Sequence, residues 1–84
     1  MTDGEILLKN ADKIHTTKMG LERIGKNLSL NGADAIEYCK KRISDKNCVV
    51  IRRGKNYYCE IDNVTITVNA HSFTVITAHK AKQF

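Results

Sequence analysis

The second half of the chain is a succession of β-forming segments joined by connections of only two or three residues. CVVIRR, YYCEI, VTITVN and FTVITAHK are rich in Val, Ile, Thr and aromatic residues, a composition that favours β-strands. Residues 54–56, 62–63 and 70–72 connect them. Parallel neighbours need a crossover of roughly a dozen residues, so connections this short can only join antiparallel strands. Residues 47–80 are therefore predicted to form a four-stranded antiparallel β-meander.

The first half of the chain instead repeats apolar residues at helical spacing. Three segments carry apolar positions three, four and seven apart. The first is residues 3–14, the second starts at a cap at Thr16 or Thr17 and runs to about Asn27, and the third starts at a cap at Asn31 or Asp34 and runs to about Ile43. The two to three helices are predicted to pack on one face of the sheet, which gives a two-layer α+β fold. The 84 residues suffice for a single domain, with its helical part at residues 1–45.

The alternation of residue types assigns faces to the strands. Tyr57, Cys59 and Ile61 are predicted to point inward, and Val64, Ile66 and Val68 share one face of the next strand. The opposite, polar face would then carry Tyr58, Glu60, Thr65, Thr67 and Asn69. The last strand is apolar at both parities, as in a central strand that is buried on both sides, so its inward face stays open.

The cysteines and the terminal segment narrow the class of protein. Cys39, Cys48 and Cys59 form no CxxC pair, so they are predicted to be buried free thiols, and neither a metal site nor a cofactor is expected. No apolar run approaches the roughly 18 residues that cross a membrane. The N-terminus opens with acidic residues and lacks a secretory signal, which favours the cytoplasm.

Positive charge points to an anionic partner. The formal net charge is +5, and nucleic acid is the commonest polyanion. Arg52, Arg53 and Lys55 surround Gly54, an arrangement that can grip a phosphate or simply keep a hairpin tip soluble. On the polar sheet face, the Tyr58 ring with an arginine and threonine hydroxyls can hold RNA. A merely solvated antiparallel face commonly carries threonines as well.

The histidines could carry chemistry. His15 follows the first helix, His71 lies in the last connection, and His79 ends the last strand, preceded by Thr77. Two imidazoles flanking a phosphate suffice for RNA cleavage without a metal, because one removes the 2′-OH proton and the other protonates the leaving oxygen. Isolated surface histidines are the alternative, since nothing in the sequence brings the three together.

The stretches HTTKMGLERIGKNL, AIEYCKKRI, RRGKNYYCEIDN and ITVNAHSFTVITAHK resemble the small bacterial proteins grouped as domain of unknown function 3781. VNAHSFTVITAHK is the most specific part, and the family name implies no activity. The layout of helices followed by a sheet is also similar to the barnase–EndoU–colicin–RelE group of ribonuclease toxins. In that group the polar sheet face holds the active site, which implies roles here for His15, Arg52 or Arg53, Thr77 and His79. An inactive or purely binding descendant has the same layout.

The leading prediction is an RNA-binding domain of the ribonuclease-toxin type, which in an active form would be a metal-independent endoribonuclease. The catalytic residues would be His15, Thr77 and His79, and the residues that bind phosphate or bases would be Arg52, Arg53, Lys55, Tyr58 and Lys80. The alternative is a non-enzymatic protein-binding module, such as a small inhibitor or antitoxin-like partner, that uses the open sheet face or its edge. A folded accessory domain without a ligand is the third.

Overall fold

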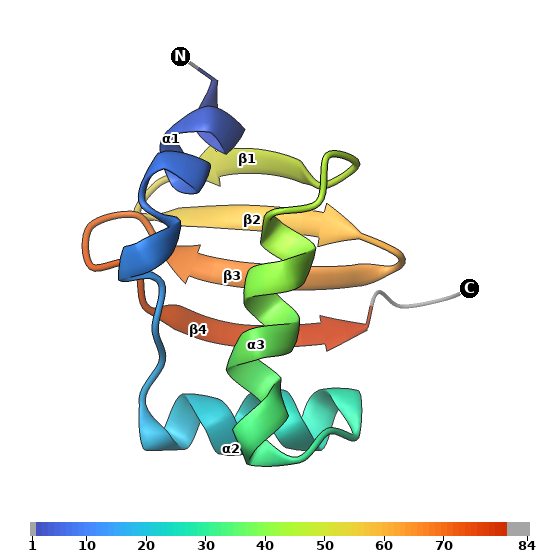
Figure 1. The fold of residues 1–84 in the computed structure, drawn as a ribbon. Coiled ribbons are helices and arrows are strands. Elements are labelled where there is room, and N and C mark those ends of the chain that lie inside the picture. Colours follow the sequence, from blue (N-terminus) through green and yellow to red (C-terminus); the bar gives the residue numbers. More distant parts are fainter. Residues whose placement is uncertain (1, 81–84) are drawn as a thin grey trace.

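Three helices precede a four-stranded sheet in the computed structural model, which describes residues 2–80 (Figure 1). The helices are α1 (Asp3–Lys9), α2 (Lys18–Leu28) and α3 (Gly32–Ile43), with a 3₁₀ turn at Ala11–Lys13 after α1. The strands are β1 (Val49–Arg53), β2 (Asn56–Ile61), β3 (Val64–Asn69) and β4 (Val75–Lys80). The predicted α+β class and the order of helices before strands are confirmed.

The strands lie side by side in their sequence order, and every neighbouring pair is antiparallel. The predicted meander is therefore confirmed. Its short turns use left-handed backbone: φ is 58° at Gly54 between β1 and β2, and 50° and 64° at Asp62 and Asn63 between β2 and β3. Two successive left-handed residues match the twist of a tight hairpin, and Asp and Asn adopt this conformation more readily than most residues.

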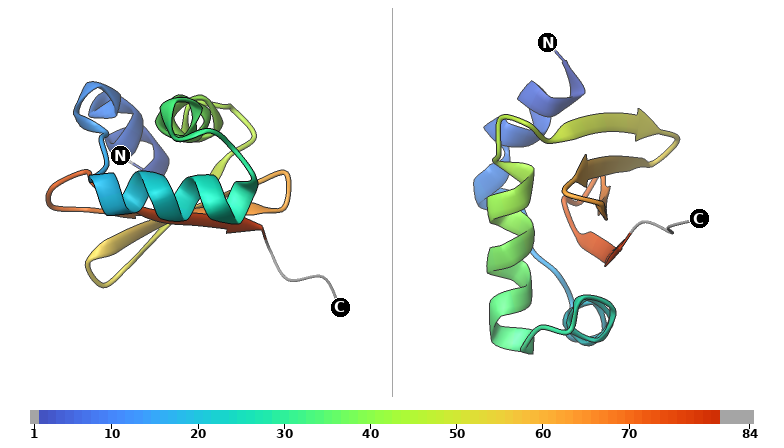
Figure 2. Two further views of the ribbon diagram at one scale, coloured as in Figure 1. Left: turned by 90° about the horizontal axis from the view of Figure 1, so that it is seen from below. Right: turned by 90° about the vertical axis from the view of Figure 1, so that its right-hand side faces the viewer.

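The helices cover one face of the sheet and reach both of its edges (Figure 2). α3 crosses the strands, α1 packs against β1, and α2 runs alongside β4 (Figure 1). The covered face carries core residues of β2 and β3 that are each at most 8% exposed, namely Tyr57, Cys59, Ile61, Val64, Ile66 and Val68. The inward face predicted for β2 and the shared apolar face predicted for β3 are thus confirmed.

A β-bulge gives β4 its inward face. Val75 and Ala78 are both buried although they are three residues apart, a spacing that places side chains on opposite faces of a regular strand. Val68 pairs with Val75 while Thr67 pairs with Thr77, so Ile76 is the extra residue. The bulge explains why both parities of this strand are apolar. β4 is an edge strand and not the central strand that such a pattern suggests.

Polar side chains from the helical part cover the edge of β4. Thr16 Oγ1 donates a hydrogen bond to the carbonyl of Val75 at 2.8 Å. Asn27 Nδ2, near the end of α2, donates to the carbonyl of Ala78 at 3.2 Å. Unpaired backbone groups at a sheet edge invite pairing with another chain, so these contacts limit extension of the sheet on this side.

The first helix is shorter than predicted. It ends at Lys9 and not at residue 14, because Asn10 turns back and its Nδ2 donates to the carbonyl of Ile6 at 2.8 Å. At its other end, Asp3 reaches β1, where its Oδ2 accepts a hydrogen bond from the backbone N–H of Arg52 at 3.0 Å. α1 therefore closes part of the opposite edge of the sheet.

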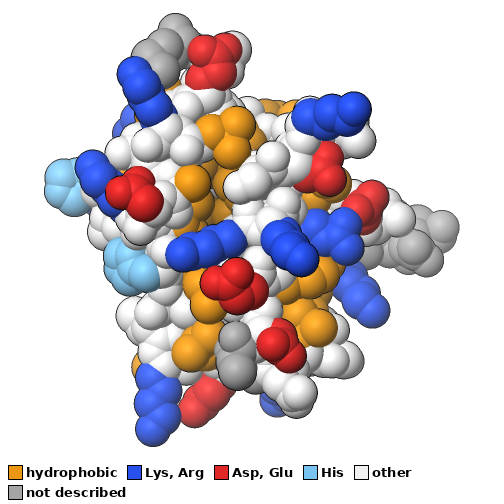
Figure 3. Space-filling model, in the orientation of Figure 1, with side chains coloured by type: hydrophobic (Ala, Val, Ile, Leu, Met, Phe, Trp, Pro, Cys, Tyr) orange, Lys and Arg blue, Asp and Glu red, His pale blue; other side chains and the backbone are white. Residues whose placement is uncertain are grey.

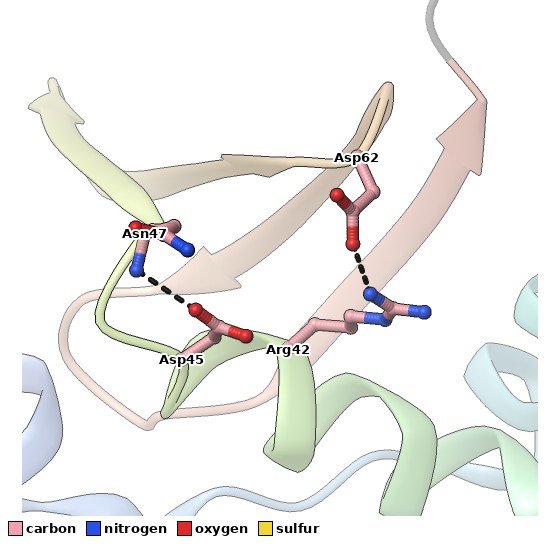
Figure 4. A network of polar contacts seen from close by, with 4 residues as sticks. All are labelled: Arg42, Asp45, Asn47 and Asp62. Atoms are coloured by element: carbon pink, nitrogen blue, oxygen red, sulfur yellow. Dashed lines mark hydrogen bonds and ion pairs between the residues drawn. The ribbon is translucent and has the colours of Figure 1, made fainter.

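The C-terminal end of α3 is tied to the sheet by polar contacts (Figure 4). Arg42 on α3 forms an ion pair with Asp62 in the β2–β3 turn. In the loop that enters β1, Asp45 Oδ1 accepts a hydrogen bond from the backbone N–H of Asn47 at 2.8 Å. These contacts fix the end of the sheet that lies opposite the Gly54 turn.

The three cysteines are free thiols near the contact between α3 and the sheet. Cys39 and Cys59 are buried, which confirms the prediction for them, whereas Cys48 is only half-buried. Burial raises the pKa of Cys39 to about 11. A hydrogen bond from the Cys59 thiol lowers the pKa of Cys48, against the opposing effects of burial and of Asp45, and the same hydrogen bond raises the pKa of Cys59.

Alkylation should therefore distinguish the three thiols. We expect iodoacetamide to modify Cys48 first in the folded protein, because the thiolate is the reactive species and Cys48 has the lowered pKa. Its rate should level off below the pH of about 8.5 at which an ordinary thiol is half ionised. Mass spectrometry of timed samples measures the order, and Cys48→Ser should remove the fast phase. Rapid labelling of Cys39 before unfolding would contradict this expectation.

Gly20 on α2 leaves room for the contact between Thr16 and Val75. A Cβ at Gly20 would lie 2.1 Å from Thr16 Oγ1 and 3.3 Å from the Val75 carbonyl oxygen. We expect Gly20→Ala to lower the free energy of unfolding by about 1–3 kcal/mol, although in an open helix it would be stabilising by about 1 kcal/mol. Urea unfolding measures the change. The cost should shrink in a Thr16→Ala background, and an equal cost in both backgrounds would refute the steric explanation.

Candidate nucleic-acid interface

The face of the sheet turned away from the helices is uncovered in the part of the chain that the structure describes (Figure 2). We call it the open face. The strand register arranges its side chains in three rows, which are Val49–Glu60–Thr65–His79, Ile51–Tyr58–Thr67–Thr77 and Arg53–Asn56–Asn69. The polar residues of β2 and β3 that were predicted to share a face do share it. Apolar side chains of β1 join them.

Tyr58 lies near the centre of the open face, between Ile51 on β1 and Thr67 on β3. Ile51 is 44% exposed and Val49, in the next row, is 54% exposed. Thr67 is only 7% exposed although it points away from the helices, so its neighbours on the open face enclose it. A hollow of about 290 Å³ is lined by Ile51, Arg53, Tyr58 and Glu60. It combines an aromatic and aliphatic floor with one cation and one carboxylate.

The pleat of β1 separates the two arginines of the predicted phosphate grip. Arg53 belongs to the open face, whereas Arg52 lies on the helix side, with its guanidinium carbon 5.8 Å from the centre of the Tyr57 ring. Arg52 Nε also donates to the carbonyl of Gly54 at 3.3 Å. Arg52 lines a second hollow of about 610 Å³ together with Lys55, Asn69, His71 and Ser72. We call it the turn pocket, because it lies between the β1–β2 turn and the β3–β4 loop.

Asn69 organises the loop that forms one wall of the turn pocket. Its Oδ1 accepts hydrogen bonds from the backbone N–H groups of His71 and Ser72, both at 2.9 Å, and from Ser72 Oγ at 3.2 Å. The backbone N–H of Ala70 donates to the carbonyl of Lys55 at 2.8 Å and so joins this loop to the β1–β2 turn. The two turns are therefore held together as one unit. In Figure 3, histidine side chains lie at the left edge of the molecule, over this end of the sheet, together with Lys or Arg side chains and an Asp or Glu side chain.

His15 and His79 lie at opposite ends of β4. His15 Nδ1 donates to the carbonyl of Lys13 at 2.8 Å, and its Nε2 lies 3.2 Å from Thr74 Oγ1, at the start of the strand. His79 pairs with Thr65 near the other end. The rise of a strand separates Thr74 from His79 by roughly 15 Å. The structure does not bring the two imidazoles together, so one phosphate could not lie between them.

The other predicted site residues are also divided. Thr77 Oγ1 accepts a hydrogen bond from Asn27 Nδ2 at 3.4 Å, so its hydroxyl is engaged by α2. Lys80 is exposed opposite Val64, at the end of the sheet away from Lys55. The predicted binding residues thus fall into separate places: Tyr58 and Arg53 on the open face, Arg52 and Lys55 in the turn pocket, and Lys80 near neither.

Sequence reasoning missed the part that Asn69 and Ser72 play beside the basic turn, and it treated His71 only as one of three histidines. A local signal was present. Asparagine followed closely by small and polar residues, as in NAHS, is typical of a turn in which the asparagine side chain binds backbone N–H groups. The proximity of that loop to Lys55 depends on the register between β2 and β3, which no local signal carries.

Two further properties bear on the kinds of site that are present. Within residues 2–80, no three His, Cys, Asp or Glu side chains are grouped so that they could hold a metal ion. Over the same range, no helix has both the length and the apolar character needed to cross a membrane.

The comparisons with known proteins identify the family of this chain. Residues 8–79 match the family model described as "Protein of unknown function (DUF3781)". No curated protein and no solved structure matches the chain. The more distant likeness to ribonuclease toxins therefore has no support from these comparisons. The family match covers most of the chain, from the end of α1 to the end of β4. The protein therefore belongs to this family of unknown function.

Proposed function

We propose that the protein binds single-stranded RNA on its open face. The observation that carries the proposal is the position of Tyr58, an aromatic ring near the centre of an uncovered antiparallel face. A base stacked on such a ring contributes about 1–3 kcal/mol and needs no particular sequence. Sheets with exposed aromatic residues suit single strands because the bases of a single strand are free to leave their own stack.

The groups around Tyr58 suit the remaining parts of a nucleotide. Arg53 supplies a cation for a phosphate on one side of the ring. Thr65 and Asn56 can donate to and accept from a ribose hydroxyl or a base edge. Glu60 can accept from a base amino group but repels phosphate, so the phosphate chain is expected to pass on the Arg53 side. The net charge of +5 adds long-range attraction to any polyanion.

The proposal is binding and not cleavage. General acid–base cleavage needs both groups within hydrogen-bond reach of one phosphate, and His15 and His79 lie at opposite ends of β4. A single imidazole at His79, in the same row as Thr65 and Glu60, is left on the open face. It can contact RNA without acting as half of a catalytic pair.

Replacing the ring tests the stacking contact. We expect Tyr58→Leu to weaken binding of a short single-stranded RNA about tenfold or more, because it keeps an apolar side chain but removes the stacking surface. Tyr58→Phe keeps the ring and should retain most of the affinity. Fluorescence anisotropy with a labelled oligoribonucleotide measures the dissociation constants, and circular dichroism confirms that each variant is folded. Equal losses for Leu and Phe would rule out stacking as the source of affinity.

The salt dependence of binding tests the role of Arg53. Each phosphate neutralised by the protein releases counterions, so the logarithm of the affinity falls with the logarithm of the salt concentration. Arg53→Gln should make that slope shallower by about one phosphate contact. Lys46→Gln is the matched control, since Lys46 is exposed in the loop before β1, away from the Gly54 turn, and its replacement removes the same charge. Indistinguishable slopes for the two variants would argue against a phosphate contact at Arg53.

A second candidate function is supported by the exposed aliphatic side chains of β1. Val49 and Ile51 are 54% and 44% exposed on the open face, which a protein partner could bury. This candidate corresponds to a non-enzymatic protein-binding module. It becomes the better one if oligoribonucleotides of every base fail to bind at low salt. A Val49→Thr/Ile51→Thr variant, which keeps β-branched side chains, should then lose a partner whose binding changes little with salt.

A further inference from the structure

We propose that the turn pocket is a binding site for a phosphate monoester. Of its lining residues, only Asn69 also belongs to the rows of the open face, so the site goes beyond RNA binding there. The pocket has about twice the volume of the hollow at Tyr58, 610 Å³ against 290 Å³. Its lining comes from the ends of two strands and the connections that follow them: Arg52 of β1 with Lys55 of the first turn, and Asn69 of β3 with His71 and Ser72 of the β3–β4 loop.

The lining is cationic and contains no carboxylate. Arg52 and Lys55 carry permanent positive charge, and His71 becomes positive when it is protonated. The Asp3 carboxylate accepts a hydrogen bond from the backbone N–H of Arg52, and Asp3 is not among the lining residues. Within the described residues, neither the Lys55 ammonium nor the His71 ring has a protein hydrogen-bond partner. Both remain available to an anion.

The pocket is held in shape before any ligand arrives. Asn69 Oδ1 fixes the backbone N–H groups of His71 and Ser72, and the Ala70 to Lys55 hydrogen bond fixes the distance between the two connections. Arg52 is positioned by the Tyr57 ring and by the Gly54 carbonyl. A preformed arrangement of donors loses little entropy on binding, which favours a small ligand with few contacts of its own.

A monoester fits this donor set better than a phosphate within a nucleic-acid chain. A phosphate monoester carries a charge of about −1.5 to −2 near neutral pH and offers three terminal oxygens. Arg52, Lys55 and the His71 ring together supply donors for three oxygens. The Ser72 hydroxyl is not counted among them, because it donates to Asn69 Oδ1. A phosphodiester has one charge and two free oxygens. The pocket also lies at the end of the sheet, where a terminal group would sit, and its volume leaves room for what the phosphate is attached to.

The monoester could belong to a mononucleotide or to the end of an RNA held on the open face. Only the second source rests on the proposed function. NMR titration of the isotope-labelled full chain separates the two. The ligands are inorganic phosphate, a nucleoside monophosphate, and one oligoribonucleotide prepared with a 5′-phosphate, with a 3′-phosphate and with neither.

We expect inorganic phosphate and the monophosphate to shift the amide signals of Lys55, His71 and Ser72 at low salt. If the source is an RNA end, one phosphorylated oligoribonucleotide should bind about tenfold more tightly than its unphosphorylated form, as expected for added charge-assisted hydrogen bonds. If the source is a mononucleotide, the pocket signals should respond to the monophosphate while the oligoribonucleotides show no preference. Absence of pocket shifts with every phosphate-bearing ligand overturns the proposal.

Lys55→Gln is the main variant, because this side chain is exposed on a turn and we expect its replacement to leave the fold intact. It should weaken monophosphate binding about tenfold, and Arg52→Gln should do the same. Lys46→Gln removes the same charge elsewhere and should change the affinity less than twofold. An equal loss in Lys46→Gln would mean non-specific attraction and would overturn the site. Binding of unphosphorylated RNA that depends on Tyr58 tests the open face separately, so either proposal can fail alone.

Discussion

Ile24 of α2, Ile43 of α3, and Ile66 and Val68 of β3 belong to one buried cluster in which each is at most 2% exposed. This contact between helices and sheet is what the rest of the structure depends on. Burial of a large aliphatic side chain stabilises a fold by about 1.5–3 kcal/mol, and a chain of 84 residues has few such side chains to spare. The apolar residues of the helices pack against only one face of the sheet. The other face must tolerate water, and threonines, asparagines and Tyr58 allow it to do so while offering a partner both polar and aromatic groups.

The same helical part determines which surfaces of the sheet stay available. Asp3 engages a backbone group of β1, and Thr16 and Asn27 engage backbone groups of β4. A partner that adds a strand needs a row of free N–H and C=O groups, which these contacts reduce at both edges. Binding by side chains on the open face is therefore better suited to this sheet than strand addition. That reasoning favours a ligand recognised by stacking and hydrogen bonds, and it applies to a protein partner as well as to RNA.

Much of the fold follows from local pattern, because short connections force antiparallel neighbours and alternation assigns the faces of β2 and β3. The arrangement of the candidate site residues is predicted less well from local sequence pattern. The bulge that turns Ala78 inward depends on packing against α2 and on pairing with β3, and neither leaves a signal in the five letters VITAH. The separation of His15 from His79 is a property of register. His15 bridges Thr74, at the start of the strand whose other end carries His79, and a sequence cannot reveal that contact without the fold.

The adjacent arginines illustrate how register converts a sequence cluster into two sites. In the sequence, Arg52, Arg53 and Lys55 form one basic run. In the strand, successive side chains point to opposite faces, so Arg53 joins Tyr58 on the open face while Arg52 packs over Tyr57 and faces Lys55 and the β3–β4 loop. For the two arginines to change places, β1 would have to slip by one residue against β2, and that slip would also turn Val50 away from the core. The core therefore enforces the division of charge, and a single chain contacting both places would have to cross the end of the sheet at the Gly54 turn.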